Sequence, residues 1–384
     1  MIWKPSLEDT DLMLKLLIVD DSALMRRHLT QLFESEGEFI IRHARNGKEA
    51  VRENREFEPD VVTLDINMPE MDGISALSLI MAERPVPVIM LSSLTTKGAI
   101  ATFEALNLGA VDFVPKPDGT ISLSVDDIAR ELITKVRSAA RAKLRSARAT
   151  HSTASSSAAP STRATENLAR KTERPSHRAS RPTSDSMHTA VGVRDKVVII
   201  GVSTGGPRTL EDILPAIPAT LKAPIVIAQH MPASFTQSLA SRLDRACRLK
   251  VVEVSRATAL ETGTVYIGRG SADITLCVRN GQMYAQSKPE HPEYLWHPSV
   301  ELLGQSAMKH CDPKKVMAVL LTGMGHDGSV AFTDLHRKGA STIAESADSA
   351  IVFGMPAELI ERRGAGKVLP ASAIASNIIQ FAGH

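Results

Sequence analysis

The chain has 384 residues, of which 43% are hydrophobic and 23% charged, and a formal net charge of +2. That length is too great for one ordinary hydrophobic core and predicts two domains. A charge near zero gives no general case for binding nucleic acid or membranes. The three cysteines show no Cys-x-x-Cys spacing, which argues against a zinc site or a disulfide framework. Without a secretory signal or an apolar run near the roughly 18 residues that span a bilayer, we expect a cytoplasmic, soluble protein.

Residues 14–140 follow an N-terminal extension of residues 1–13 and alternate between apolar strands and amphipathic helices. Strands are expected at 15–19, 39–43, 60–64, 86–91 and 111–114, and helices at 23–35, 47–56, 74–83 and 97–108. A last helix is expected to start at the N-cap Ser124 and to bury Leu132, Ile133 and Val136. Successive βα units predict an α/β fold with a doubly wound parallel sheet, whose ligands lie beyond the carboxyl ends of the strands.

Polar residues stand at those strand ends. Asp20 and Asp21 follow the first strand and Asp65 the third, while Ser92 and Lys116 follow the fourth and fifth. Three converging carboxylates need compensation, which a hard divalent cation such as Mg²⁺ supplies. A lysine and a hydroxyl opposite them could hold a phosphoryl group on Asp65.

These residues stand in the segments LIVDDSALMR, LDINMPEMDG, VIMLSSLT and FVPKPDG, and residues 14–140 resemble the receiver domain of two-component response regulators, a flavodoxin-like fold. The resemblance implies that Asp65 is the phospho-acceptor and that a sensor histidine kinase is the phosphoryl donor. It also implies that Asp20, Asp21, Asp65 and the backbone carbonyl of Asn67 bind Mg²⁺.

From residue 141 to 194 the composition changes to Ser, Ala, Thr and Arg without sustained apolar periodicity. Such a segment cannot bury enough apolar surface to offset the entropy of ordering, so we expect a long, disordered linker. Its excess of basic residues leaves open an interaction with nucleic acid or membranes, although scattered charges without aromatic residues favour a solvated tether.

Alternation resumes at Lys196 and continues to the end of the chain, which predicts a second α/β domain over residues 195–384. The run KVVIIGV is a buried-strand signal, and it stops at the turn STGGP before a helix. Such a turn can present Ser203 as a nucleophile with helix N–H groups directed at an oxyanion. The alternative is a phosphate-binding turn in which Ser203 only caps the helix.

Three polar side chains end apolar strands in this segment: Ser203, His230 and Asp327. A serine hydroxyl is a weak nucleophile until an imidazole takes its proton, and a buried carboxylate holds that imidazole in one tautomer. His291 and His297 are alternative bases in a Pro-rich loop that we interpret as a flap or substrate wall. The remaining histidines considered are His310 and His336, on predicted helices, and His326, beside Asp327.

The motifs GVSTGGP, AQHMP, HPSVELL, LTGMGHDG and FGMPAE resemble the catalytic domain of the chemotaxis protein-glutamate methylesterases, which carry a receiver in front of it. The resemblance implies Ser203 as nucleophile, His230 as base and Asp327 as orienting acid, with Thr204 and Met324 near the oxyanion. It implies phosphorylation-regulated hydrolysis of glutamate γ-methyl esters on the cytoplasmic helices of chemoreceptors, releasing methanol, with glutamine deamidation by the same site. No cofactor is expected for hydrolysis.

One segment, GTVYIGRGSADITL, departs from the family, which usually has an Ala-Pro-Gly turn and then a histidine there. Two other output classes are alternatives to the esterase. A DNA-binding output would need a small helix-turn-helix with a basic recognition helix, whereas this output is a long α/β segment of near-neutral charge. A nucleotide-binding module at the Gly201–Gly206 turn would need a Walker lysine or a Gly-x-Gly-x-x-Gly pattern, and this turn has neither. We further expect the unphosphorylated receiver to cover the Ser203 cleft.

Overall fold

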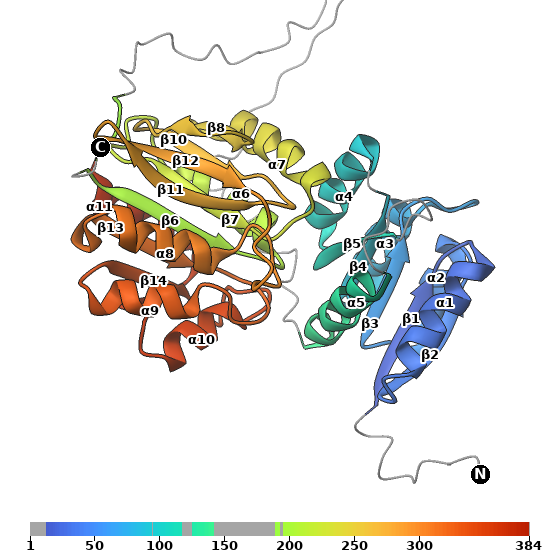
Figure 1. Cartoon of the computed structure of the whole chain (residues 1–384). Helices are drawn as coiled ribbons and strands as arrows, with labels where there is room; N and C mark the ends of the chain where they lie inside the picture. Colours follow the sequence, from blue (N-terminus) through green and yellow to red (C-terminus); the bar gives the residue numbers. More distant parts are fainter. Residues whose placement is uncertain (1–12, 94, 117–124, 142–188, 193–194, 384) are drawn as a thin grey trace, which may run out of the picture. The chain divides into compact units, whose positions relative to one another are not determined.

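The structure is a computed structural model that describes residues 13–93, 95–116, 125–141, 189–192 and 195–383 (Figure 1). The N-terminal extension and nearly all of the predicted linker lie outside the described residues, and so does Ser124. No helix in the described ranges is long and apolar enough to cross a membrane. The first half of the chain comprises the described residues up to 141, and the second half those from 189 onward.

The first half contains a five-stranded parallel sheet in the order β2-β1-β3-β4-β5. Its strands are β1 (Leu14–Val19), β2 (Phe39–Ala44), β3 (Val61–Asp65), β4 (Val88–Ser92) and β5 (Asp112–Pro115). Its helices are α1 (Ala23–Glu34), α2 (Gly47–Phe57), α3 (Gly73–Glu83), α4 (Thr96–Leu108) and α5 (Val125–Ala140). The strand order reverses at β1, which confirms the predicted flavodoxin-like, doubly wound sheet.

The helix boundaries in this half have local causes. The side chains of Ser22, Asn46, Asp72 and Thr95 each accept a hydrogen bond from an amide in the first turn of the helix that follows. Such caps satisfy N–H groups that have no partner within the helix and typically stabilise it by about 1 kcal/mol. The helices therefore start close to the predicted positions.

The second half contains a seven-stranded parallel sheet and a three-stranded antiparallel sheet, in the orders β15-β14-β13-β6-β7-β10-β8 and β11-β12-β9. The strands are β6 (Val197–Val202), β7 (Ile225–Gln229), β8 (Lys250–Val254), β9 (Thr258–Ala259), β10 (Thr264–Gly268), β11 (Asp273–Arg279), β12 (Gln282–Lys288), β13 (Val316–Leu320), β14 (Ser341–Glu345) and β15 (Lys367–Leu369). The helices are α6 (Gly206–Ile213), η3 (Leu214–Ala216), α7 (Ala233–Ala246), α8 (Val300–His310), η4 (Pro313–Lys315), α9 (Ser329–Arg337), α10 (Met355–Glu361) and α11 (Ala371–Ala382).

Both faces of the large sheet are covered, so its central strand is apolar throughout. Val198 and Ile200 of β6 pack in a buried cluster with α6, α7 and α11, whereas Val197 and Ile199 pack with α8, α9 and α10. Alternate residues of one strand thus face two helical layers, which is the pattern of a doubly wound sheet. The prediction of a second doubly wound domain is confirmed.

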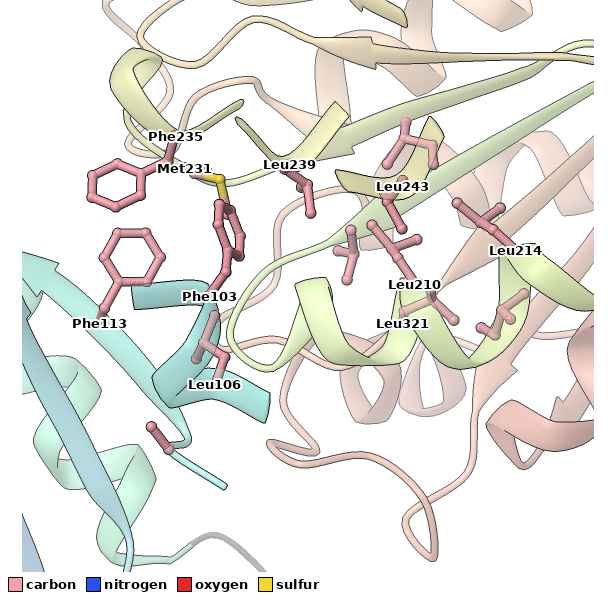
Figure 2. Close-up of a cluster of buried hydrophobic side chains, with 14 of the residues drawn as sticks. Phe103, Leu106, Phe113, Leu210, Leu214, Met231, Phe235, Leu239, Leu243 and Leu321 are labelled. Atoms are coloured by element: carbon pink, nitrogen blue, oxygen red, sulfur yellow. The ribbon is translucent and has the colours of Figure 1, made fainter. Parts of the chain in front are cut away.

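Leucines fill the layer between α6 and α7. Figure 2 shows Leu210 of α6 and Leu239 and Leu243 of α7 in one buried cluster, which also contains Leu321, the residue after β13. All four side chains are fully buried, and burying one leucine contributes about 1.5–3 kcal/mol. This packing fixes α6, and with it the turn that precedes the helix.

Three elements of the second half differ from expectation. The first helix starts at Gly206, inside the segment STGGP that was expected to be a turn before the helix, because Pro207 suits the first helical turn, where its missing N–H has no cost. The short edge strands β9 and β15 have only two and three residues, which carry too little pattern for prediction. A hairpin at Asn280-Gly281 joins β11 to β12, with both residues at positive φ.

Candidate active site

The predicted acidic cluster forms at the carboxyl edge of the five-stranded sheet. Carboxylate oxygens of Asp20, Asp21 and Asp65 lie within 4.8 Å of one another. The Lys116 ammonium contacts one oxygen each of Asp20 and Asp65, both at 2.8 Å. Burial raises the pKa of Asp65, and the contact with Lys116 offsets only part of that effect. Three clustered carboxylates offer hard oxygen donors, and they fit Mg²⁺ because this ion needs oxygen ligands and brings positive charge.

Ser92 and Asn67 also lie at this edge. Ser92 is the last residue of β4, and its buried hydroxyl accepts a hydrogen bond of 2.8 Å from Thr102 Oγ1. Asn67 is exposed and donates its backbone N–H to Asp65 Oδ1 at 3.2 Å. Its carbonyl makes no hydrogen bond to the described residues, so it remains available as a ligand.

At the second site, Ser203 follows the final residue of β6 and is buried. Its N–H donates to the Thr322 carbonyl at 3.0 Å, and its own carbonyl accepts the Gly206 N–H at 2.8 Å. The turn passes through Gly205 at φ +80°, a left-handed conformation that glycine adopts without strain. At Gly323 a Cβ would lie 2.7 Å from Ser203 Cβ. Ser203 therefore needs glycine both after it and opposite it.

His230 is placed beside Ser203 by strand register. Val202 of β6 pairs with Gln229 of β7. Ser203 directly follows Val202, and His230 directly follows Gln229, so the two residues leave neighbouring strands at the same level. The His230 N–H donates to the Val202 carbonyl at 3.1 Å. The buried Gln229 amide donates to the carbonyls of both Ser203 and His230, at 3.0 and 3.1 Å. Sequence reasoning did not assign Gln229 this role, although a polar residue inside a buried strand was a signal for it.

Asp327 holds the other side of His230. Its Oδ2 lies 2.8 Å from His230 Nε2, and both side chains are almost completely buried. The carboxylate also accepts the N–H groups of Val300 and Glu301, at 2.7 and 2.9 Å, at the start of α8. Burial alone would raise the pKa of Asp327, but the hydrogen bonds from His230 and these amides outweigh it, and the pKa lies below the ordinary carboxyl value. Asp327 is thus a stabilised anion at a helix N-terminus.

The remaining nitrogen of His230 has no partner. Nδ1 is buried and forms no hydrogen bond within the described part of the chain. A buried imidazole with a carboxylate on one nitrogen and nothing on the other can accept a proton at the free one.

The residues predicted near an oxyanion lie on two different turns. Thr204 is buried, and its carbonyl accepts a 2.9 Å hydrogen bond from Thr322 Oγ1. Met324 follows Gly323, whose N–H donates to the Val352 carbonyl at 3.0 Å. Among the described residues, neither the Thr204 nor the Met324 N–H donates a hydrogen bond.

The predicted flap supplies an aromatic neighbour of His230 that sequence reasoning did not single out as a site residue. The Trp296 ring is stacked on the His230 ring, with centroids 5.9 Å apart and planes at 12°. The alternative base His297 instead pairs with Asp273, Nδ1 to Oδ1, at 2.8 Å. The His326 and Trp296 rings meet edge to face, with centroids 5.6 Å apart. The His336 ring is hydrogen-bonded to the Thr342 hydroxyl of β14. Within the described ranges, His230 is the one histidine of those considered whose ring is hydrogen-bonded to the Asp327 carboxylate.

The geometry of both halves therefore defines a response regulator whose output is a hydrolase. Comparison with known proteins gives the family. Residues 16–124 match the response regulator receiver domain, and residues 198–378 match the CheB methylesterase. A protein-glutamate methylesterase/protein-glutamine glutaminase of Rhodospirillum rubrum is 49% identical over 370 residues, covering 95% of either chain.

Two further relatives bear the same name. The protein of Rhodopseudomonas palustris is 46% identical over 96% of this chain and 98% of its own, and that of Carboxydothermus hydrogenoformans is 43% identical over 96% and 99%. The chain belongs to the family of CheB methylesterases that carry a receiver domain. A DNA-binding or nucleotide-binding output is thereby set aside.

Proposed function

We propose that Ser203, His230 and Asp327 carry out the reaction of this family, phosphorylation-regulated hydrolysis of glutamate γ-methyl esters on chemoreceptors. The single observation that carries the proposal is the His230 imidazole, paired with Asp327 on one nitrogen and free on the other, next to the Ser203 turn. Ser203 Oγ attacks the ester carbonyl while His230 Nδ1 takes its proton. The N–H groups of Thr204 and Met324 stabilise the oxyanion that forms.

The intermediate then collapses, and the ester C–O bond breaks. His230 returns its proton to the leaving methoxide, which departs as methanol and leaves an acyl-enzyme on Ser203. Water, deprotonated by His230, hydrolyses that ester and gives glutamate. An amide passes through a similar tetrahedral intermediate, so the same residues deamidate glutamine with ammonia as the leaving group. These steps use no cofactor.

The receiver half accepts the phosphoryl group on Asp65 from a sensor histidine kinase. Asp20, Asp21, Asp65 and the Asn67 carbonyl would hold Mg²⁺, which would supply positive charge for the incoming phosphoryl group. The Lys116 ammonium and the Ser92 hydroxyl would hold that group on Asp65. In this assignment the receiver spans residues 14–140, the catalytic domain residues 195–384, and residues 141–194 are a tether.

Methanol release from methylated receptor tests the proposal. Ser203→Ala should lower the rate by about a thousandfold or more, since removal of one member of such a triad has effects of this size. Asp65→Asn should retain the basal rate and lose the response to a phosphodonor. Full activity of Ser203→Ala would refute the assignment.

Regulation by occlusion has its own test. If the unphosphorylated receiver covers the Ser203 cleft, a chain that begins at residue 195 should have a higher basal rate than the full chain. An unchanged or lower rate would count against occlusion without touching the chemistry.

A further inference from the structure

Asp327 by itself does not fix the orientation of the His230 ring. The contact between Asp327 Oδ2 and His230 Nε2 holds one atom at the ring edge. A ring that is held at Nε2 and through its Cβ–Cγ bond can still rotate about χ2. The direction of Nδ1, and so its alignment with a serine proton, requires a second contact on the face of the ring.

Trp296 supplies that contact. Its ring lies nearly parallel to the imidazole, at 12°. Trp296 is held in turn by His326, whose ring meets it at 86°. Gly325 leaves room for it, because a Cβ there would lie 2.8 Å from Trp296 Cη2. Offset-stacked rings attract each other beyond the effect of the area that they bury.

The segment that carries Trp296 is closed by one buried carboxylate. Asp273 Oδ2 accepts the His291 N–H at 2.8 Å, and Oδ1 accepts the Ser299 N–H at 2.8 Å. Oδ1 also meets His297 Nδ1 at 2.8 Å. The Asp273 side chain is 1% exposed. Both ends of residues 291–299, which we call the Trp296 loop, are therefore tied to a single group.

The loop also leads directly into the Asp327 site. Three successive N–H groups donate to two carboxylates, that of Ser299 to Asp273 and those of Val300 and Glu301 to Asp327. Ser299 Oγ donates to Asp327 Oδ1 at 3.2 Å. A shift of the loop would therefore change the orientation of His230 through two contacts, the stacked Trp296 ring and the Asp327 carboxylate.

We propose that Asp273 and Trp296 are positioning residues for the ester hydrolysis: Asp273 holds the Trp296 loop, and Trp296 holds the plane of the His230 ring. This inference rests on the proposed role of His230 as the base. The segment that departs from the family pattern, GRGSAD, ends in Asp273. The segment that differs from the family pattern therefore contributes, through Asp273, to the orientation of His230 in this chain.

Steady-state methanol release from methylated receptor by the full chain tests the inference. Trp296→Leu should lower kcat about tenfold and leave KM within about twofold, because misorientation of the base affects the chemical step rather than binding. Trp296→Phe keeps a stacking ring and should restore most of kcat. Asp273→Asn should lower kcat to a similar extent. Asp334→Asn is the matched control and should retain kcat, because this carboxylate is 44% exposed and is paired with Arg337.

A double variant separates positioning from independent damage. If Asp273 acts through Trp296, then Asp273→Asn with Trp296→Leu should be no slower than the worse single variant by more than about twofold. If the loss of kcat in the double variant equals the product of the two single losses, Asp273 does not act through Trp296. A wild-type kcat for Trp296→Leu would overturn the role of the ring, and this variant decides the matter even where Asp273→Asn folds poorly.

Fluorescence reports the ring directly. The chain has two tryptophans, Trp3 and Trp296, so Trp3→Phe leaves Trp296 as the single fluorophore. In that background Asp273→Asn should change the Trp296 emission, and Asp334→Asn should not. Loss of activity in Ser203→Ala together with wild-type rates in Trp296→Leu and Asp273→Asn would reject this inference alone. Activity in Ser203→Ala would reject the proposed function itself.

Discussion

His230 and Asp327 are 97 positions apart in the chain, yet His230 Nε2 and Asp327 Oδ2 lie 2.8 Å apart, and both side chains are almost completely buried. The carboxylate reaches the imidazole because the glycine-rich turn after β13 returns toward β7 and because the start of α8 donates two N–H groups to the same side chain. The fold therefore positions Asp327 independently of its contact with His230.

Asp327→Asn should lower kcat for methyl ester hydrolysis by about a thousandfold or more. An amide cannot stabilise an imidazolium and can favour the wrong tautomer of His230. It also meets the Val300 and Glu301 N–H groups with a weaker acceptor, so the free energy of unfolding should fall by about 1–3 kcal/mol. Methanol release and denaturant unfolding measure the two effects, with Asp334→Asn as the exposed control. A variant with normal kcat would show that the carboxylate is not needed.

Gly323→Ala should impair both activity and stability. Its Cβ would lie 2.7 Å from Ser203 Cβ and 2.4 Å from Met355 Sδ, so Ser203 must move. Such overpacking typically costs about 1–3 kcal/mol, and a displacement of about 1 Å at a nucleophile can cost a hundredfold in rate. Gly192→Ala is the matched control, because its nearest non-bonded atom would be 3.4 Å away. Equal rates for the two variants would contradict the close approach.

Removal of Mg²⁺ should abolish phosphorylation of Asp65 and leave unstimulated ester hydrolysis unchanged. The three carboxylates at the receiver site would provide the oxygen ligands, whereas the steps proposed at Ser203 do not involve a metal. Incorporation of label from a small-molecule phosphodonor, measured with and without EDTA, checks the first part, and methanol release checks the second. Asp65→Asn should match the EDTA result. Labelling that persists in EDTA would argue against the metal site.

The pair of Asp273 and His297 should make stability depend on pH. For each group burial opposes the charged form and is the largest single effect on its pKa. The hydrogen bond and charge attraction within the pair outweigh burial only together with further contacts, which are the Ser299 and His291 N–H groups for Asp273 and the Glu290 charge and the Tyr294 backbone for His297. The pKa of His297 is therefore raised and that of Asp273 is lowered. The contribution of His297 is full below its unfolded pKa of about 6.5 and is lost as pH rises through the folded value, whereas that of Asp273 is full above about 3.8 and is lost as pH falls through its folded value.

The difference in Tm between the parent chain and Asp273→Asn should accordingly be largest between about pH 4 and 6.5. It should shrink at more alkaline pH, where His297 is neutral and the hydrogen bonds from the His291 and Ser299 amides remain. Thermal unfolding of both chains across this range is the measurement. A difference that is constant with pH would mean that the ion pair contributes nothing.

Much of this architecture could be predicted from the sequence because its signals are local. Apolar strands followed by polar residues placed Asp65, Ser203 and His230 at sheet edges, and parallel strands bring their carboxyl ends together. The start of α6 was placed too late because a glycine-proline pair read as a turn rather than as the first turn of a helix.

The contacts that orient the site were beyond such reasoning. The partners of Asp273 come from residues 18 and 26 positions later in the chain, and no periodicity links them. Trp296 lies in the loop that the sequence predicts to be a flap, but its place on the His230 face depends on the space that Gly325 leaves. Long-range packing of this kind is set by the tertiary fold and not by local sequence pattern.

Covalent labelling of Ser203 tests the central claim most directly. A fluorophosphonate should modify the full chain at Ser203, as located by mass spectrometry, and the rate should fall by at least about a thousandfold in His230→Gln, because the hydroxyl loses its base. Modification at another residue, or an equal rate in the parent chain and His230→Gln, would contradict a serine activated by His230.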